Sequence, residues 1–220
     1  GGNMVTDWLK KQDIPTTFVR GERVTDKPAL EMVAAVLGGL MNKQIVGTIN
    51  ALGGRAVGIS GVDGALVQGR VGNKELGYVG VTEKVDATVL LALLGAGFIP
   101  IIAPLISYTV DRPADAPPML NINGDPLAGD IAAALKAEKL VFLTDVAGIS
   151  DKNGKLLPRL NRNEAQALIE SGVAAGGMIP KINGCLKVIA VGGTAYIVDG
   201  RQPGALRNAV EKGITGTIIQ

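Results

Sequence analysis

The feature that most constrains this chain is an alternation of short, uniformly apolar runs with longer runs whose apolar residues recur at helical spacing. The short runs are rich in valine, isoleucine and leucine with little polar alternation, which is typical of strands buried on both faces of a parallel sheet. Candidate strands are Thr17–Val19, Ala56–Ser60, Ile99–Ala103, Leu140–Thr144, Ala195–Val198 and Thr217–Ile219. The pattern predicts an α/β fold, a three-layer α/β/α sandwich with a mainly parallel central sheet.

The longest helical pattern covers Pro28–Leu52, and Thr25 or Asp26 can serve as its N-cap. This segment is rich in alanine, leucine, methionine and glycine. Such a helix can pack within the fold or against a second subunit, and the sequence favours the two equally. Gly64–Thr82 is predicted to form hairpins. Further helices are predicted at Glu83–Gly95, Pro126–Lys136, Asn163–Ser171, Lys181–Val191 and Pro203–Lys212.

Composition excludes several classes of protein. The 220 residues carry 22 basic and 20 acidic side chains, a net charge of +2, which argues against a protein that coats nucleic acid or an anionic membrane. The single cysteine excludes an internal disulfide framework, and the absence of histidine excludes His-based triads, His-ligated zinc and haem. No signal peptide is visible and no apolar run reaches the ~18 residues of a membrane span, so we expect a soluble, cytoplasmic protein.

Ligands of open α/β sheets bind at the carboxyl ends of strands, so the strand-to-helix junctions are the candidate sites. Gly1 and Gly2 precede a helical pattern, and glycines there let backbone amides approach an anion. Arg23 lies just before the long helix, where its guanidinium can hold a carboxylate through two parallel hydrogen bonds. A solvated arginine, or an arginine paired with Asp26, is the alternative.

Asn121 and Asn123 are two residues apart in an extended segment, so their side chains point to the same side and suit an oxygen-rich ligand. Asp125 directly precedes Pro126 and is well placed as an N-cap. Lys181 follows a glycine-rich loop and falls in the first turn of a helix, where the helix dipole disfavours a cation. An anion such as a phosphoryl group would compensate it; a surface lysine is the alternative.

The strand that ends at Thr144 is followed by Asp145, a glycine turn and Asp151. These polar groups can line a nucleotide pocket, although capping of local turns explains either aspartate almost as well.

Five segments in the same order resemble motifs of the N-acetylglutamate kinases, which belong to the amino acid kinase family. They are Gly1-Gly2, Gly-Glu-Arg-Val-Thr-Asp at 21–26, Asn-Ile-Asn-Gly-Asp at 121–125, Leu-Thr-Asp-Val-Ala-Gly-Ile at 143–149 and Gly-Gly-Met-Ile-Pro-Lys at 176–181. The resemblance covers essentially the whole chain. It implies transfer of the γ-phosphoryl group of ATP to the γ-carboxylate of N-acetyl-L-glutamate in arginine biosynthesis.

The resemblance also implies the substrate-binding residues. Backbone amides of Gly1 and Gly2 would stabilise the transferring phosphoryl group and adjoin the substrate. Arg23 would hold the α-carboxylate of the substrate, and Asn121 and Asn123 would hold the same ligand. Residues 1–125 would mainly bind the acyl amino acid and form a dimer, and residues 126–220 would mainly bind the nucleotide.

For catalysis, the resemblance implies that Lys181 neutralises phosphate charge and that Asp125 orients the catalytic lysines. Mg²⁺ would accompany ATP rather than occupy an all-protein site, as is usual for this ion. A carboxylate nucleophile is already ionised at neutral pH, so a chain without histidine is compatible with this chemistry. The residues implied near the nucleotide are Thr144, Asp145, Val146, Gly148, Met178 and Lys181.

The sequence departs from the family pattern at its start, because family members begin with a strand and a Lys-x-Gly-Gly phosphate loop upstream of Gly1. A chain that begins at Gly1 lacks one catalytic lysine, and we expect it to be inactive or badly impaired. A kinase assay of this chain beside an upstream-extended form tests that expectation. Gly124 also stands where the family usually has alanine.

Two other functions fit the same residues. One is a kinase that acts on carrier-bound aminoadipate or glutamate in lysine biosynthesis, although Ile179-Pro180 favours the acetyl-amino-acid type. The other is a non-catalytic module that binds a nucleotide or an acidic amino acid. The partners implied by the resemblance are a second copy of the chain in a homodimer, a hexamer in longer forms, and a nitrogen-signalling protein.

Overall fold

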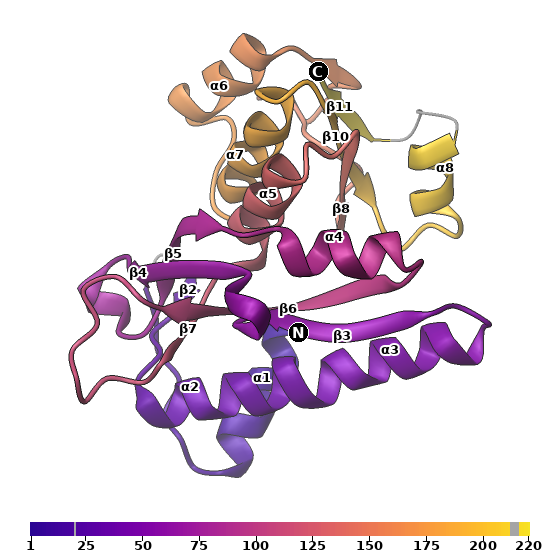
Figure 1. Ribbon diagram of the computed structural model, residues 1–220. Coiled ribbons are helices and arrows are strands. Elements are labelled where there is room, and N and C mark those ends of the chain that lie inside the picture. Colours follow the sequence, from indigo (N-terminus) through magenta and orange to yellow (C-terminus); the bar gives the residue numbers. More distant parts are fainter. Residues whose placement is uncertain (20, 212–215) are drawn as a thin grey trace. The chain divides into compact units, whose positions relative to one another are not determined.

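The computed structural model describes residues 1–19, 21–211 and 216–220, which fall into two compact units (Figure 1). The N-terminal unit is Gly1–Gly124 and the C-terminal unit is Asp125–Gln220. Each unit packs helices on a sheet of its own.

The sheet of the N-terminal unit is mixed. Strands β3 and β4 both pair with β6 in parallel, whereas β4 and β5 form an antiparallel hairpin and β7 returns antiparallel to β6. The hairpin overlaps the region Gly64–Thr82, for which hairpins were predicted, and its second strand extends beyond that region to Val85. The strands of this sheet are β3 (Ala56–Gly61), β6 (Ile99–Tyr108), β4 (Val67–Val71), β5 (Gly80–Val85) and β7 (Met119–Asn121).

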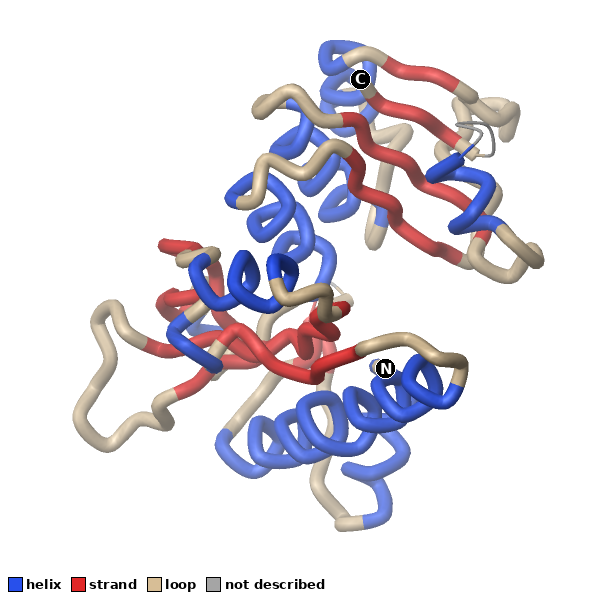
Figure 2. Tube along the Cα trace, turned by 45° about the vertical axis from the view of Figure 1, so that its right-hand side comes forward, coloured by secondary structure: helices blue, strands red, loops and turns tan. Residues whose placement is uncertain are grey.

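Helix α1 (Gly2–Lys11) and a long helical run pack together in this unit. The run consists of α2 (Lys27–Val33), a π-helical stretch (Ala34–Met41) and α3 (Asn42–Ala51), of which α3 lies along β3 in Figures 1 and 2. Asp26 is its N-cap and accepts a hydrogen bond of 2.9 Å from the Ala29 amide. The helices meet in a buried cluster of Val5, Leu9, Ala29, Leu30, Val33, Val36 and Leu105.

Between α1 and the long run, β1 (Phe18–Val19) and β2 (Glu22–Arg23) form a short antiparallel hairpin. The remaining elements of the N-terminal unit are short helices at Asp63–Ala65 and Lys74–Leu76 and the helix α4 (Thr88–Gly95).

The C-terminal unit is a three-layer sandwich. In the part of it that the structure describes, the sheet order is β8-β10-β11-β9, with β8 parallel to β10 and β10 antiparallel to β11. Ala195 and Ile197 of β10 face one layer of helices, and Tyr196 and Val198 face α8 on the other side. The elements are α5 (Gly124–Ala134), β8 (Lys139–Thr144), β9 (Arg159–Leu160), α6 (Arg162–Glu170), α7 (Met178–Ile189), β10 (Thr194–Asp199), α8 (Ala205–Glu211) and β11 (Thr217–Ile219).

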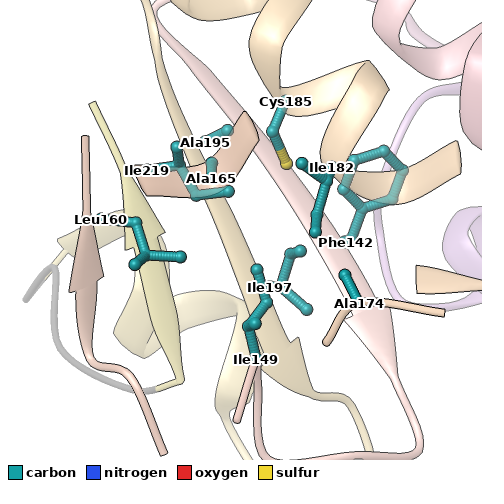
Figure 3. Close-up of a cluster of buried hydrophobic side chains, with 10 residues drawn as sticks. All are labelled: Phe142, Ile149, Leu160, Ala165, Ala174, Ile182, Cys185, Ala195, Ile197 and Ile219. Atoms are coloured by element: carbon teal, nitrogen blue, oxygen red, sulfur yellow. The ribbon is translucent and has the colours of Figure 1, made fainter. Parts of the chain in front are cut away.

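Figure 3 shows the core between this sheet and its larger helical layer. Phe142 of β8 and Ile197 of β10 pack against Ile182 and Cys185 of α7. Burial raises the pKa of the Cys185 thiol to about 12, so this cysteine behaves as a small apolar packing group.

The α/β fold class is confirmed, as are the six predicted strands, but the strands lie in separate sheets rather than in one. The predicted helix Glu83–Gly95 is wrong at its start, because Glu83 belongs to β5 and pairs with Arg70 of β4 at 2.6 Å. The Asp86 carboxylate accepts a hydrogen bond from the Thr88 amide and places the beginning of α4 there. Helix α7 begins at Met178 rather than Lys181, and Lys212 of the helix predicted over Pro203–Lys212 lies outside the described residues.

The expectation that no apolar run is long enough for a membrane span is corrected by the helical run Lys27–Ala51. By length and composition alone it is apolar enough to cross a membrane, although glycine, threonine, asparagine and lysine interrupt its apolar residues. Core helices and signal sequences meet the same criterion. Only 17% of its most apolar window is buried in the structure.

Helices α5 and α7 cross where two glycines meet. A Cβ atom on Gly129 would lie 2.5 Å from the Cα of Gly184, so a side chain here would force the helices apart. Asp125 lies one turn before Gly129, and Lys181 lies about one turn before Gly184. The close crossing therefore brings these two charged side chains together.

Replacing Gly129 with alanine is expected to lower the free energy of unfolding by about 1–3 kcal/mol, because the added methyl group overpacks the crossing. Chemical denaturation followed by circular dichroism measures the change. Gly124→Ala is the matched control in the same helix, since a Cβ there meets nothing within 4 Å. Equal stability of the two variants would show that the crossing tolerates a side chain.

Candidate functional site

The N-terminal unit contains a pocket of about 160 Å³ at the ends of β2 and β7. Arg23 comes from β2, Asn121 is the last residue of β7, and Asn123 follows two residues later. Charged, amide and apolar groups thus line one small cavity. Its lining residues are Gly21, Glu22, Arg23, Val79, Asn121, Ile122 and Asn123.

The guanidinium of Arg23 is held on one side and unsatisfied on the other. Its Nη2 atom donates to the Thr6 hydroxyl at 2.9 Å and to the Gly2 carbonyl at 3.0 Å. Nη1 is buried and has no hydrogen-bond partner among the described residues. A buried donor without a partner is costly, and a ligand carboxylate would satisfy it.

The local environment of Arg23 excludes the two alternatives weighed from the sequence. The side chain is half-buried rather than solvated, and desolvation lowers the pKa of its guanidinium. Asp26 does not pair with it, because that carboxylate caps α2.

Asn121 is connected to Arg23 through Thr25. The Asn121 side-chain amide donates to the Thr25 hydroxyl at 3.2 Å, and this hydroxyl donates to the Arg23 carbonyl at 3.1 Å. Thr25 is fully buried, so the network lies beneath the pocket rather than in solvent. The arrangement ties the Asn121 amide to the backbone of Arg23 beside the same cavity.

Gly1 and Gly2 form the start of α1. Gly1 is the N-cap, and its carbonyl accepts the first helical bond from the Val5 amide at 3.1 Å. The free amide groups of a first helical turn favour anions. The hydrogen bond from Arg23 to the Gly2 carbonyl joins this turn to the pocket.

In the C-terminal unit, Lys181 and Asp125 form an ion pair, with Nζ and Oδ2 2.7 Å apart. Their side chains are 23% and 24% exposed, so the pair is partly shielded from water. The prediction that Asp125 is an N-cap is wrong, because α5 begins at Gly124 and Asp125 lies inside its first turn. Asp125 therefore provides an anionic partner for Lys181 within the protein.

The residues expected near a nucleotide begin at the carboxyl end of β8. The Thr144 hydroxyl lies 3.1 Å from the Val198 carbonyl and accepts from the Val146 amide at 3.2 Å, which shapes the turn. Gly148 has a φ of 151°, a conformation that favours glycine. Asp145 is exposed in this turn, and Met178 is the first residue of α7.

At this edge of the sheet, an ion pair was not expected and the turn-capping alternative holds for Asp151. Asp199 lies opposite Thr144 in the β8–β10 register, and its carboxylate binds the Arg201 guanidinium at 2.8 and 3.0 Å. The hydrogen bonds from Arg201 hold the pKa of Asp199 well below its usual range. Asp151 caps its own turn, because its carboxylate accepts from the Asn153 and Lys155 amides at 2.8 and 2.9 Å.

Within the part of the chain that the structure describes, histidine, cysteine and acidic residues do not gather in groups of three or more that could hold a metal ion.

An α/β fold with anion-binding groups at its strand ends suits a protein that binds phosphate-bearing or carboxylate ligands. Residues 1–199 match the family described as the amino acid kinase family, and the chain belongs to this family. It is 45% identical over 219 residues to an acetylglutamate kinase of Dehalococcoides mccartyi, covering 100% of this chain and 80% of that protein.

A further relative and a solved structure are also similar to this chain. The chain is 46% identical over 211 residues to an acetylglutamate kinase of a Synechococcus species, covering 94% of this chain and 70% of that protein. The crystal structure of smu.665 from Streptococcus mutans superposes with a TM-score of 0.83 at 29% identity, covering 100% of this chain and 83% of that one.

Proposed function

We propose that this protein is an ATP-dependent kinase that phosphorylates the γ-carboxylate of N-acetyl-L-glutamate in arginine biosynthesis. The observation that carries the proposal is the buried, unsatisfied Nη1 of Arg23 beside a pocket of about 160 Å³. The relatives from Dehalococcoides mccartyi and the Synechococcus species support the same assignment, since both are acetylglutamate kinases. A kinase of carrier-bound substrates and a non-catalytic module are not favoured by these comparisons.

In this proposal Arg23 binds the α-carboxylate of N-acetyl-L-glutamate through charge-assisted hydrogen bonds. Asn121 and Asn123 hold polar groups of the same ligand, and the apolar Val79 and Ile122 line the cavity around its carbon atoms. The γ-carboxylate is ionised at neutral pH and acts as the nucleophile without a general base.

Catalysis then rests on alignment and charge stabilisation. The amides of Gly1 and Gly2 donate to the transferring phosphoryl group, and Lys181 neutralises its growing negative charge. Asp125 orients Lys181 through the 2.7 Å ion pair. The γ-phosphorus–oxygen bond to ADP breaks as the bond to the carboxylate oxygen forms, so the products are ADP and an acyl phosphate.

The nucleotide site in this proposal is the carboxyl end of β8, with Thr144, Asp145, Val146, Gly148 and Met178. ATP enters as its Mg²⁺ complex, because this ion usually remains bound to waters and substrate phosphates. We place the reaction in the cytoplasm, where this biosynthetic use of ATP is expected.

A specificity assay tests the proposal. The protein as the cell makes it is incubated with Mg²⁺-ATP, hydroxylamine and one of three acceptors: N-acetyl-L-glutamate, L-glutamate or L-α-aminoadipate. Hydroxamate formed with N-acetyl-L-glutamate and in small amounts with the others is the expected result. Binding of N-acetyl-L-glutamate in calorimetry without hydroxamate would instead favour a non-catalytic module.

The helical run Lys27–Ala51 is proposed as the contact between two subunits of a homodimer. Leu40 and Ile45 are 37% and 43% exposed on this run, although burial of such side chains is favourable. Light scattering is expected to give the mass of a dimer for the wild type and a smaller mass for Ile45→Glu, since a buried unpaired carboxylate opposes association. A wild-type monomer at micromolar concentration would contradict this contact.

A further inference from the structure

The hydroxyl of Thr6 lies at the centre of a contact between α1 and Arg23. It donates to the Gly2 carbonyl one turn earlier at 3.0 Å and accepts from Arg23 Nη2 at 2.9 Å. The same Nη2 donates to the Gly2 carbonyl at 3.0 Å. Three polar groups therefore form a closed triangle at the first turn of α1.

This triangle determines which N–H groups of Arg23 remain for a ligand. A guanidinium has five N–H donors, and its Nη2 group finds acceptors in the Thr6 hydroxyl and the Gly2 carbonyl. Arg23 lines the pocket, and its Nη1 is buried with no partner among the described residues. The contact thus engages one end of the guanidinium and leaves the other for the ligand.

Phe18 restrains the plane of the same guanidinium. The ring centroid lies 4.8 Å from Arg23 Cζ, within the range of a cation–π contact. Phe18 is 52% exposed, so the contact is made at the surface rather than in the core. The hydrogen bonds that Arg23 donates to α1 and the contact with the Phe18 ring of β1 together hold the side chain.

We propose that Thr6 and Phe18 are positioning residues that hold Arg23 in the orientation in which Nη1 meets the carboxylate of the ligand. This inference rests on the proposed function, because it takes Arg23 as the group that binds the α-carboxylate. Thr6 also connects the first turn of α1, where Gly1 and Gly2 are proposed to meet the phosphoryl group, to the carboxylate-binding arginine.

Calorimetry with two ligands tests this role, using N-acetyl-L-glutamate and its α-carboxamide. Thr6→Val keeps the shape of the side chain and loses the hydroxyl, so the Kd of N-acetyl-L-glutamate is expected to rise about tenfold. The Kd of the α-carboxamide is expected to change less than twofold, because that ligand lacks the carboxylate. Thr6→Ser restores the hydroxyl and is expected to restore binding.

Two further variants complete the experiment. Ser171→Ala removes a comparable hydroxyl-to-carbonyl bond four residues back in a helix, 2.7 Å to Ala167, and is expected to bind as the wild type does. Phe18→Leu is expected to raise the Kd of N-acetyl-L-glutamate about threefold, because the cation–π contact is lost. Since Phe18 is exposed, this variant is expected to fold as the wild type does.

The outcomes separate the two proposals. If the wild type binds N-acetyl-L-glutamate but Thr6→Val and Phe18→Leu bind it equally well, the positioning role is overturned and the proposed function stands. Equal weakening of both ligands by Thr6→Val would also overturn it, because the effect would not depend on the carboxylate. If the wild type binds neither ligand, the proposed function fails and the positioning role fails with it.

Discussion

Replacing Lys181 with methionine is expected to lower kcat for acyl phosphate formation by about 10²–10³-fold, the usual cost of removing one group that stabilises transition-state charge. Methionine retains the length of the side chain and removes only the ammonium. Asp125 loses its ion pair with Lys181, but at 24% exposure its carboxylate can be hydrated, so the fold is expected to survive. Steady-state kinetics with saturating Mg²⁺-ATP and N-acetyl-L-glutamate measure the change.

The same pair of helices provides a matched control. Lys187 of α7 pairs with Asp130 of α5 at 2.5 Å, so Lys187→Met removes an ion pair of the same kind between the same elements. Its kcat is expected to stay within twofold of the wild type. An equal loss of activity in both variants would mean that Lys181 acts through the stability of the α5–α7 contact and not on the phosphoryl group.

Replacing Arg23 with methionine is expected to raise the KM for N-acetyl-L-glutamate about 100-fold, because two hydrogen bonds to a charged carboxylate are lost and each is worth about 1.5 kcal/mol or more. The KM for Mg²⁺-ATP is expected to change little, since the α-carboxylate is not part of the nucleotide. Initial rates measured with each substrate varied in turn separate the two effects.

Arg70→Met is the control for this second prediction. Arg70 also lies on a strand of the N-terminal unit and pairs with Glu83. Unlike that of Arg23, its side chain is 45% exposed to solvent. Exposed pairs contribute little, so kinetics close to the wild type are expected. If Arg23→Met leaves the KM for N-acetyl-L-glutamate unchanged, Arg23 does not bind the substrate carboxylate.

Much of the fold follows from local pattern. The strands at Ala56, Leu140, Ala195 and Thr217 were predictable because apolar, β-branched runs between glycines suit buried strands. The beginning of the helix after Asp26 was predictable because its carboxylate caps the first turn.

Other features depend on contacts that sequence spacing does not reveal. The local sequence predicts that a helix begins at Glu83, yet Glu83 pairs with Arg70 across a hairpin. Pairing between strands therefore overrides the local preference for a helix. Asp125 resembles an N-cap, yet its carboxylate meets Lys181, which is 56 residues away, because two glycines let α5 and α7 cross closely.

In the candidate site too, some residues were predictable from local sequence and others depend on tertiary contacts. Arg23, Asn121 and Asn123 were predictable as polar groups at strand ends, and they line one pocket. Thr6, Phe18 and Thr25 were not, because each acts through a tertiary contact with a residue already singled out. The spacing of four residues between Gly2 and Thr6 was a signal for the hydrogen bond from the Thr6 hydroxyl to the Gly2 carbonyl. That spacing does not indicate that Arg23 donates to the same hydroxyl.

The most direct test of the central claim is a ³¹P NMR spectrum of the protein, as the cell makes it, incubated with Mg²⁺-ATP and N-acetyl-L-glutamate. We predict that an acyl phosphate resonance and the resonances of ADP grow together, and that neither grows when N-acetyl-L-glutamate is omitted. ATP that stays intact, or that yields inorganic phosphate with no acyl phosphate intermediate, would contradict the assignment.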